Sequence, residues 1–325
     1  MERFFAIVNP AAGGGRSAKL AGPALERLRK SGLEVDEVTT GAPGDAVLLA
    51  REAYTEGYRR FLAVGGDGTG HEILNGIFGG AAITQRAGAQ HAGAERRVAA
   101  QGTRAESATA ERVAMGFLPL GTGNSFLRDY TREGAKASLQ ALLERRTRAI
   151  DLMRLTHSTG EMYSFNLVSV GFTANVGALT NRHFKPFGHL GYLLGVCVRL
   201  AQLRPLTFAV RCDEDVEWDQ RPCLFLTFNN SAYTGGTMWI APSADASDGL
   251  IEYVHWGPIG RFAALRMLPT IYDGRHMQHP QASRRAVRHV EFNMPSAVDV
   301  MVDGEVLALQ CHALDIVPAA VDVYI

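Results

Sequence analysis

The chain has 325 residues, of which 46% are hydrophobic and 20% are charged, a composition typical of globular proteins. Its 33 basic and 33 acidic residues give a formal net charge of zero, so nothing in the composition points to a nucleic-acid partner. The length exceeds the ~250–300 residues at which single hydrophobic cores stop growing, and it therefore predicts two domains.

Strands and helices alternate in the first part of the chain. Apolar runs predict strands at 4–8, 33–39, 61–64 and 115–120, and helical spacing predicts helices at 16–31, 45–57, 72–78 and 136–145. In the helix at 16–31 we expect Leu20, Leu25 and Leu28 on one side. Such an alternation predicts a mostly parallel α/β sheet.

Between Gly79 and Arg112 the alternation stops. This stretch is rich in Ala, Gly, Arg and Gln and has almost no large apolar residues, so it cannot bury a core. We expect a solvent-exposed insertion at 79–112, partly disordered and partly loosely helical. A basic arm that binds membranes is the alternative.

The second part of the chain is dominated by strand-like runs. These lie at 149–156, 162–172, 206–212, 222–230, 249–256, 287–294 and 297–302, and helical spacing is confined to a segment from Leu190 and to 259–271. The pattern predicts an antiparallel β domain, either a sandwich or an irregular barrel. We therefore expect an α/β domain at 1–149 and a mainly β domain at 150–325, and a return of the last residues (316–325) to the first domain is left open.

Neither a disulfide scaffold nor a membrane span is predicted. The four cysteines are far apart and form no Cys-x-x-Cys pair, which favours a reducing compartment. The N-terminus lacks a long apolar segment, and the segment from Leu190 is interrupted by Arg199 and is shorter than the ~20 residues that span a bilayer. We expect a cytoplasmic protein that is able to associate peripherally with a membrane. The segment 184–195, beside Arg182 and Lys185, is either a lipid entry or an ordinary core helix.

Three glycine-rich stretches follow three of the predicted strands: NPAAGGGR at 9–16, GGDGTG at 65–70 and LPLGTGNSF at 118–126. Ligands of open α/β sheets lie outside the carboxyl ends of the strands, so three such loops at one edge predict one pocket. Exposed backbone N–H groups at loop-to-helix junctions bind phosphate, and the hydroxyls of Thr69 and Thr122 and the amide of Asn124 add donors. A dinucleotide fingerprint is disfavoured because four residues separate the first strand from Gly13, and the P-loop pattern is absent.

Asp67 stands among the glycines of the second loop. A carboxylate repels phosphate unless a cation lies between them, and Mg²⁺ is commonly held by one or two carboxylates together with substrate phosphates. The alternative is that Asp67 caps the helix that follows it.

Two acidic stretches lie in the β domain. Asp245 and Asp248 precede a predicted strand, and Asp303 and Glu305 flank Gly304 in VDGE. Asp-Gly is a common hairpin signal, so the residues alone favour a turn at VDGE over a catalytic site.

Taken in order along nearly the whole chain, these motifs resemble those of the soluble diacylglycerol kinase and sphingosine kinase superfamily, especially its bacterial members. The stretches NPAAGGGR, GGDGTGHEILNG, LPLGTGNSF, APSADASDGLIEY and VDGE match five family motifs. The resemblance implies an α/β nucleotide-binding domain, a β-sandwich domain, and an active site in the cleft between them. It also implies transfer of the γ-phosphoryl group of ATP to a lipid hydroxyl at a membrane surface.

The resemblance further implies roles for individual residues. Glu305 falls on the general base, so the hairpin interpretation of VDGE gives way to a catalytic one, and Asp67 falls on the carboxylate of the Mg²⁺–ATP network. Asp245, Asp248 and Leu250 fall on a structural Mg²⁺ site that binds through the Asp248 side chain and two backbone oxygens. The nucleotide-binding positions are Asn9, Thr40, Gly65, Gly66, Asp67, Gly68, Thr69, Gly70, His71, Gly121, Thr122 and Asn124.

Two departures leave the lipid open, whether diacylglycerol, a sphingoid base or a related lipid. Diacylglycerol kinases commonly have Asp where this chain has Ser125, and His71 resembles the sphingosine kinases. The rival functions are a kinase of a soluble hydroxyl compound, similar to the NAD kinases, and a nucleotide-binding regulator without turnover. The oligomeric state is also open, a homodimer included.

Overall fold

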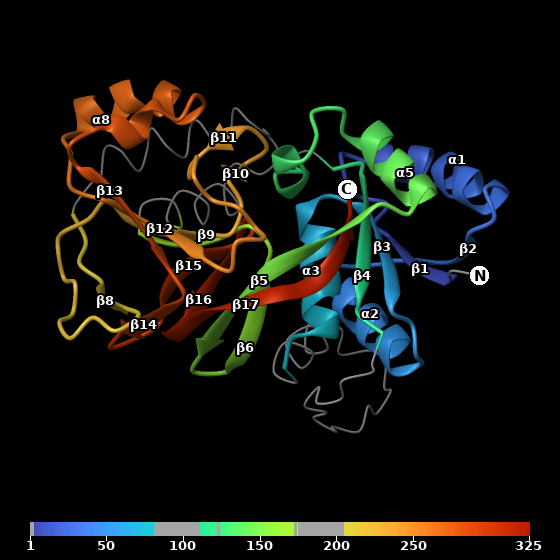
Figure 1. The fold of residues 1–325 in the computed structure, drawn as a ribbon, viewed down its shortest axis with the longest axis horizontal. Coiled ribbons are helices and arrows are strands. Elements are labelled where there is room, and N and C mark those ends of the chain that lie inside the picture. Colours follow the sequence, from blue (N-terminus) through green and yellow to red (C-terminus); the bar gives the residue numbers. More distant parts are fainter. Residues whose placement is uncertain (1–2, 81–110, 122–123, 172–173, 175–204) are drawn as a thin grey trace. The chain divides into compact units, whose positions relative to one another are not determined.

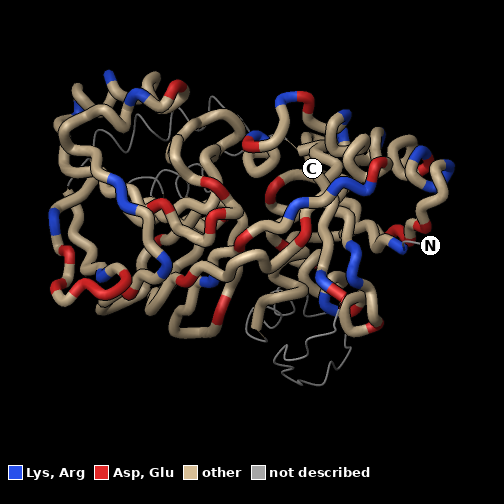
Figure 2. Tube along the Cα trace, in the orientation of Figure 1, with Lys and Arg blue, Asp and Glu red and all other residues tan. Residues whose placement is uncertain are grey.

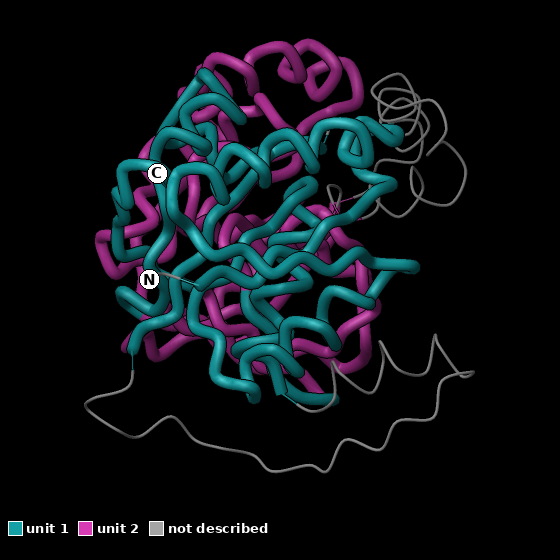
Figure 3. The backbone as a smooth tube through the Cα atoms, turned by 90° about the vertical axis from the view of Figure 1, so that its right-hand side faces the viewer, with its two compact units in different colours: residues 1–152, 159–163, 318–325 teal, residues 153–158, 164–317 magenta. Residues whose placement is uncertain are grey.

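The computed structural model describes residues 3–80, 111–121, 124–171, 174 and 205–325. The chain forms two compact units, shown in Figure 3. Unit 1 comprises 1–152, 159–163 and 318–325, and unit 2 comprises 153–158 and 164–317. The insertion predicted at 79–112, the segment from Leu190 with Arg182 and Lys185, and Thr122 lie wholly or largely outside the described residues.

Unit 1 is built on a parallel sheet in which the strand order is β2-β1-β3-β4 (Figure 1). The last residues of β17 continue it, since Asp322 pairs with Ala114 in parallel. Its elements are β1 Arg3–Val8, α1 Arg16–Lys30, β2 Glu34–Thr39, α2 Asp45–Thr55, β3 Arg60–Gly65, α3 Asp67–Ile77, β4 Ala114–Pro119, a 3₁₀ turn Phe126–Asp129, α5 Ala135–Glu144 and β6 Gly160–Ser164. The strand β5, Thr147–His157, contributes residues to both units. The predicted parallel α/β sheet is confirmed.

Helices cover both faces of the unit 1 sheet. The helices α1 and α5 pack over one face, where Leu25, Leu28 and Leu142 join a cluster with strand residues. The helices α2 and α3 pack together on the other face, and Gly70 of α3 lies against Phe117 of β4. Leu25 and Leu28 are buried but Leu20 is half exposed, so the prediction that the three leucines share one side of α1 is wrong. Ala21, which is buried, occupies that side instead.

Unit 2 contains a six-stranded antiparallel sheet in the order β13-β12-β9-β7-β15-β16. Strand β14 pairs with β8 on one side and with the first part of β17 on the other. Phe292 of β14 packs edge-on against Phe228 of β9, with 5.3 Å between the ring centroids. The elements are β7 Leu167–Gly171, β8 Ala209–Cys212, β9 Phe225–Asn229, β10 Tyr233–Thr234, β11 Met238–Trp239, β12 Ile251–Trp256, α8 Arg261–Met267, 3₁₀ turns Leu268–Ile271 and Arg275–Gln278, β13 Ala282–Val287, β14 His289–Asn293, β15 Val298–Val302, β16 Glu305–Leu309 and β17 Cys311–Tyr324. The antiparallel β-sandwich is confirmed.

The structure corrects several predicted element boundaries. The run at 162–172 is two strands, β6 and β7, which are separated by Phe165 and Asn166. The helix α3 begins at Asp67, five residues before the predicted start, so most of the second glycine loop is helical. The strands β16 and β17 had no counterpart in the prediction.

The described cysteines are Cys212, Cys223 and Cys311, and all three are buried free thiols. Burial raises the pKa of each thiol to about 12, so these thiols are protonated at neutral pH. Among the described residues, no helix is long and apolar enough to cross a membrane.

The contact of α2 with α3 depends on Gly76. A Cβ on Gly76 would lie 2.4 Å from the carbonyl oxygen of Val47, a backbone atom that cannot move aside cheaply. We expect Gly76→Ala to lower the free energy of unfolding by about 1–3 kcal/mol through overpacking. Gly22→Ala is the matched control, because Gly22 lies in α1 and has no atom within 4 Å of its Cβ position. That control should gain about 0.5–1 kcal/mol, and equal effects in thermal unfolding would refute the packing role of Gly76.

Candidate functional site

The carboxyl ends of β1, β3 and β4 meet at one edge of the unit 1 sheet, because these strands are neighbours and parallel. The three glycine-rich stretches follow them directly, as the sequence predicts. Thr40 follows β2 at the same edge and is buried, and its backbone N–H donates to the carbonyl oxygen of Val8 at 2.9 Å. Backbone from four loops therefore gathers at the edge where open α/β sheets bind ligands.

The second and third loops are locked together through their backbones. The carbonyl oxygen of Gly65 accepts hydrogen bonds from the N–H groups of Leu120 at 2.7 Å and Gly121 at 2.9 Å. A Cβ on Gly121 would lie 2.5 Å from the Cα of Gly66. Any side chain at Gly121 would thus force the two loops apart, so this glycine is required by loop packing.

The first loop is tied to the other two. Gly13, Gly14 and Gly15 all have positive φ, between 63° and 88°, which strongly favours glycine. The Arg16 guanidinium donates to the carbonyl oxygen of Gly121 at 3.0 Å. The Asn9 amide donates to the hydroxyl of Thr69 at 3.3 Å, and its oxygen accepts the N–H of Ala11 at 3.1 Å. A Cβ on Gly14 or Gly15 would meet nothing within 4 Å, so their backbone borders open space.

Asp67 is the first residue of α3, and Gly66 occupies the N-cap position. The Asp67 carboxylate accepts the backbone N–H of Ser125 at 2.7 Å. The carboxylate therefore joins the second loop to the third, and the N-cap residue provides no side-chain hydrogen bond. The alternative of Asp67 as the helix cap does not describe this geometry.

Several residues of the GGDGTGHEILNG stretch hold the fold together. The two carboxylate oxygens of Glu72 accept the N–H groups of Gly44 and Ala46, at 3.1 and 3.2 Å, at the start of α2. The Asn75 side chain forms two hydrogen bonds with the backbone of Tyr163 in β6, at 2.8 and 2.9 Å. Sequence reasoning assigned Glu72 and Asn75 no role, because their partners are remote in the chain.

Two predicted nucleotide-binding side chains are engaged within the protein. His71 is buried, and its ring lies beside the amide of Asn75. Asn124 has a positive φ of 53°, and its amide donates to the carbonyl oxygen of Gly121 at 3.1 Å. In this structure the Asn124 amide closes the third loop.

The arrangement suits a phosphate group with a cation. The first N–H groups of a helix have no partner within the helix, and α3 begins at this edge with Asp67 in its first turn. Asp67 could hold a metal ion here through its carboxylate, and a bound phosphate would supply further oxygen ligands. The chemistry available is charge neutralisation of a polyphosphate.

The VDGE stretch of unit 2 is a hairpin between β15 and β16. Val302 pairs with Glu305, and both intervening residues have positive φ, 49° at Asp303 and 94° at Gly304, as in a type I′ turn. The buried Asp303 carboxylate accepts hydrogen bonds from the Ser164 hydroxyl at 2.5 Å and from the N–H groups of Phe165, Asn166 and Leu167 at 2.9–3.2 Å. Glu305, in contrast, is exposed at the start of β16. Asp303 thus fixes the turn that presents Glu305.

Asp245 and Asp248 lie in an exposed turn before β12 of unit 2. The Asp245 carboxylate accepts the N–H and hydroxyl of Ser247, at 3.1 and 2.8 Å, and the Asp248 carboxylate accepts the N–H of Leu250 at 2.9 Å. The structure brings the three predicted metal residues together in one turn. Among the described residues there is no group of three His, Cys, Asp or Glu side chains that could hold a metal ion.

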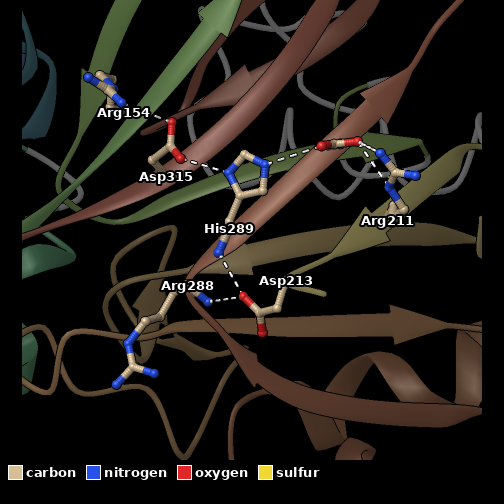
Figure 4. Close-up of polar contacts among 7 residues, drawn as sticks. Arg154, Arg211, Asp213, Arg288, His289 and Asp315 are labelled. Atoms are coloured by element: carbon tan, nitrogen blue, oxygen red, sulfur yellow. Dashed lines mark hydrogen bonds and ion pairs between the residues drawn. The ribbon is translucent and has the colours of Figure 1, made fainter. Parts of the chain in front are cut away.

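A second polar cluster lies on β14 and its neighbours in unit 2 (Figure 4). Asp315 accepts hydrogen bonds from His289 at 2.7 Å and Arg154 at 3.2 Å. Glu291 lies 3.7 Å from the other ring nitrogen of His289 and pairs with Arg211, whose hydrogen bond lowers the pKa of this carboxyl. All these side chains join adjacent strands, so we interpret the cluster as cross-strand stabilisation.

Comparison with known families matches the chain in two parts. Residues 3–155 match the diacylglycerol kinase catalytic domain, and residues 166–325 match the YegS C-terminal NAD kinase beta sandwich-like domain. Together the two matches include the three glycine-rich loops and the VDGE hairpin.

Curated proteins resemble the chain over most of its length, and a solved structure shares its fold. A diacylglycerol kinase of Mycobacterium tuberculosis is 28% identical over 98% of this chain and 93% of its own. A protein of Chromohalobacter salexigens described as a probable lipid kinase YegS-like is also 28% identical, over 90% of this chain and 84% of its own. The crystal structure of a diacylglycerol kinase from Bacillus anthracis str. Sterne has the same fold, with a TM-score of 0.65, 15% identity and coverage of 99% and 96%.

In the VDGE hairpin, the structural role of Asp303 can be tested separately from the chemical role expected of Glu305. We expect Asp303→Asn to lower the free energy of unfolding by about 2–4 kcal/mol, because the amide cannot accept all four hydrogen bonds at a buried position. Asn tolerates positive φ, so the turn itself should not oppose the change. Glu305→Gln should stay within ~0.5 kcal/mol, since that side chain is exposed. Denaturant unfolding of both variants measures this, and an unchanged midpoint for Asp303→Asn would contradict the assignment.

Proposed function

Because the chain belongs to the diacylglycerol kinase family of lipid kinases, we propose that it transfers the γ-phosphoryl group of ATP to the hydroxyl of diacylglycerol, a sphingoid base or a related lipid. Diacylglycerol is the first candidate, since relatives that span nearly the whole chain carry that activity in their names. The observation that carries the proposal is the position of Asp67, in the first turn of α3 and bonded to the third glycine loop.

Kinases of this family use ATP, and we place its phosphates at the glycine edge of unit 1. Gly14 and Gly15 border open space there, and the first turn of α3 offers backbone N–H groups. Gly65, Gly66, Gly68, Gly70 and Gly121 provide the close-packed backbone, whereas Asn9, Thr40, Thr69, His71, Thr122 and Asn124 remain proposed binding positions. Thr69 is held by Asn9, so its hydroxyl is already oriented.

We assign Mg²⁺ to Asp67. Phosphoryl transfer needs neutralisation of the charge on the transferred group, and Mg²⁺ supplies it when bound between a carboxylate and the phosphates. The hydrogen bond from the N–H of Ser125 keeps the Asp67 carboxylate oriented before any ligand arrives. The turn formed by Asp245, Asp248 and Leu250 is proposed as a separate, structural Mg²⁺ site.

Glu305 is proposed as the general base that accepts the proton of the lipid hydroxyl. Its exposure leaves the carboxylate accessible to a substrate, and the rigid turn fixed by Asp303 limits where it can point. Loss of the hydroxyl proton to the carboxylate leaves an alkoxide-like oxygen that bonds to the γ-phosphorus as the bond to ADP breaks.

The substrate requires contact with a membrane, so we propose a cytoplasmic protein that binds membranes peripherally. The rivals are a kinase of a soluble hydroxyl compound such as NAD, and a regulator without turnover. A coupled assay of ADP release across diacylglycerol, sphingoid bases, other lipids and NAD separates all three. Release with a lipid alone supports the proposal, release with NAD alone supports the first rival, and nucleotide binding without release supports the second.

We expect Asp67→Asn to lower kcat by at least about 10²-fold, as the loss of a group that stabilises transition-state charge typically does. Binding of ATP without Mg²⁺ should change little, because the amide removes a metal ligand and leaves the glycine backbone in place. Calorimetric titration with and without Mg²⁺ is the accompanying measurement. A variant with ordinary kcat and ordinary Mg²⁺ dependence would remove Asp67 from the metal site.

Glu305→Gln should lower kcat about 10²–10⁴-fold with little change in KM for ATP, because the amide keeps the size of the side chain but cannot take a proton. Asp299→Asn is the matched control, since Asp299 is an exposed carboxylate on the partner strand of the same hairpin. Steady-state rates on the preferred lipid decide the matter. If both variants retain the parental kcat, Glu305 is a surface residue and the base lies elsewhere.

A further inference from the structure

Exposed apolar side chains gather on one short segment of unit 2. The large hydrophobic residues that are exposed in the described chain are Leu20, Val216, Phe262, Leu265 and Tyr272. Phe262 and Leu265 lie in α8, and Tyr272 directly follows the 3₁₀ turn Leu268–Ile271. Phe262 is 91% exposed. Contiguous exposed apolar groups of this kind mark surfaces that bind another phase or another molecule.

The helix α8 has two faces of different character. Ala264 is buried, and Met267 and Ile271 pack against a core cluster that contains Trp256. Phe262 and Leu265 are three positions apart and lie on the opposite, solvent-facing side. Neither residue is part of the core cluster that Met267 and Ile271 contact.

Two exposed arginines flank the two apolar residues. Arg261 and Arg266 are exposed and form no ion pair with any residue that the structure describes. The nearby acidic residue Asp273 is bound to Arg275 at 2.7 Å, so it does not compensate them. Figure 2 shows basic positions along α8 and the turn after it, whereas acidic positions crowd the loop after β8.

We propose that the exposed face of α8, with Phe262, Leu265, Arg261 and Arg266, docks the protein on a bilayer that contains anionic lipid. Phe262 and Leu265 enter the boundary between headgroups and acyl chains, and the two guanidinium groups bind lipid phosphates. The inference rests on the proposed function, because an enzyme whose acceptor is a lipid must reach a bilayer. The positive charge of the face selects an anionic surface.

The test is sedimentation with vesicles of phosphatidylcholine, with and without phosphatidylglycerol. We expect the wild type to bind the anionic vesicles and to lose binding as salt is raised. The double variant F262S/L265S should bind them at least about tenfold more weakly, since it loses two apolar side chains. R261Q/R266Q should lose about fivefold per arginine on anionic vesicles only, the equivalent of about 1 kcal/mol each.

Val216→Ser is the matched control. Val216 is 88% exposed in the same unit, but it lies among acidic residues of the loop at 213–217. This variant should bind vesicles as the wild type does. All four substituted side chains of α8 are exposed, so melting temperatures should match that of the parent and exclude unfolding as the cause.

The outcomes also distinguish this inference from the proposed function. F262S/L265S should keep its kcat on lipid dispersed in detergent micelles and lose activity on vesicles. A wild type that binds anionic vesicles but phosphorylates no lipid would contradict the proposed function and leave the docking face supported. The docking face is wrong if the wild type binds no vesicles, if both double variants bind like the parent, or if F262S/L265S merely converts a dimer to a monomer with vesicle binding intact.

Discussion

The contact between Gly66 and Gly121 is the constraint on which the candidate site depends. The two backbones approach so closely that a Cβ on Gly121 would lie 2.5 Å from the Cα of Gly66. The carbonyl oxygen of Gly65 holds the approach by accepting two N–H groups of the third loop. Arg16 reaches the same loop from the first one. Three loops that are separate in sequence thereby become one rigid edge, which is the preorganisation that phosphoryl transfer requires.

This constraint changes how the glycine-rich stretches are understood. Gly65, Gly70, Gly76 and Gly121 each have a neighbouring atom within 2.6 Å of the Cβ position, so they are required by packing. Gly14 and Gly15 differ, because they border open space and have positive φ. Glycines of the second kind border open space that a ligand can enter. Asp67 combines a packing role with a proposed ligand-binding role. Its carboxylate joins the second loop to the third, and the residue lies in the first turn of α3.

The sequence predicted what depends on local pattern and on strand order. Alternating elements gave the parallel sheet, and parallel strands placed three loops at one edge. The roles of Glu72, Asn75 and Asp303 were not predictable, because each depends on partners 26 to 139 residues away. The strand β17 was missed since its polar and apolar residues lack a clear period of two. Local composition suggested a hairpin at VDGE and the family resemblance suggested a base, and the structure shows the hairpin while leaving Glu305 accessible.

The most direct measurement is of nucleotide binding by the Gly121→Ala variant. Glycine has no side chain, so the substitution removes no side-chain contact with the nucleotide. Calorimetric titration with a non-hydrolysable ATP analogue and Mg²⁺ compares it with the wild type, at a temperature where both are folded. The account predicts a loss of affinity of at least about tenfold, equivalent to 1.4 kcal/mol, because the methyl group separates the loops that form the phosphate site. Unchanged affinity in a folded Gly121→Ala protein would show that the nucleotide does not bind at the interlocked glycines.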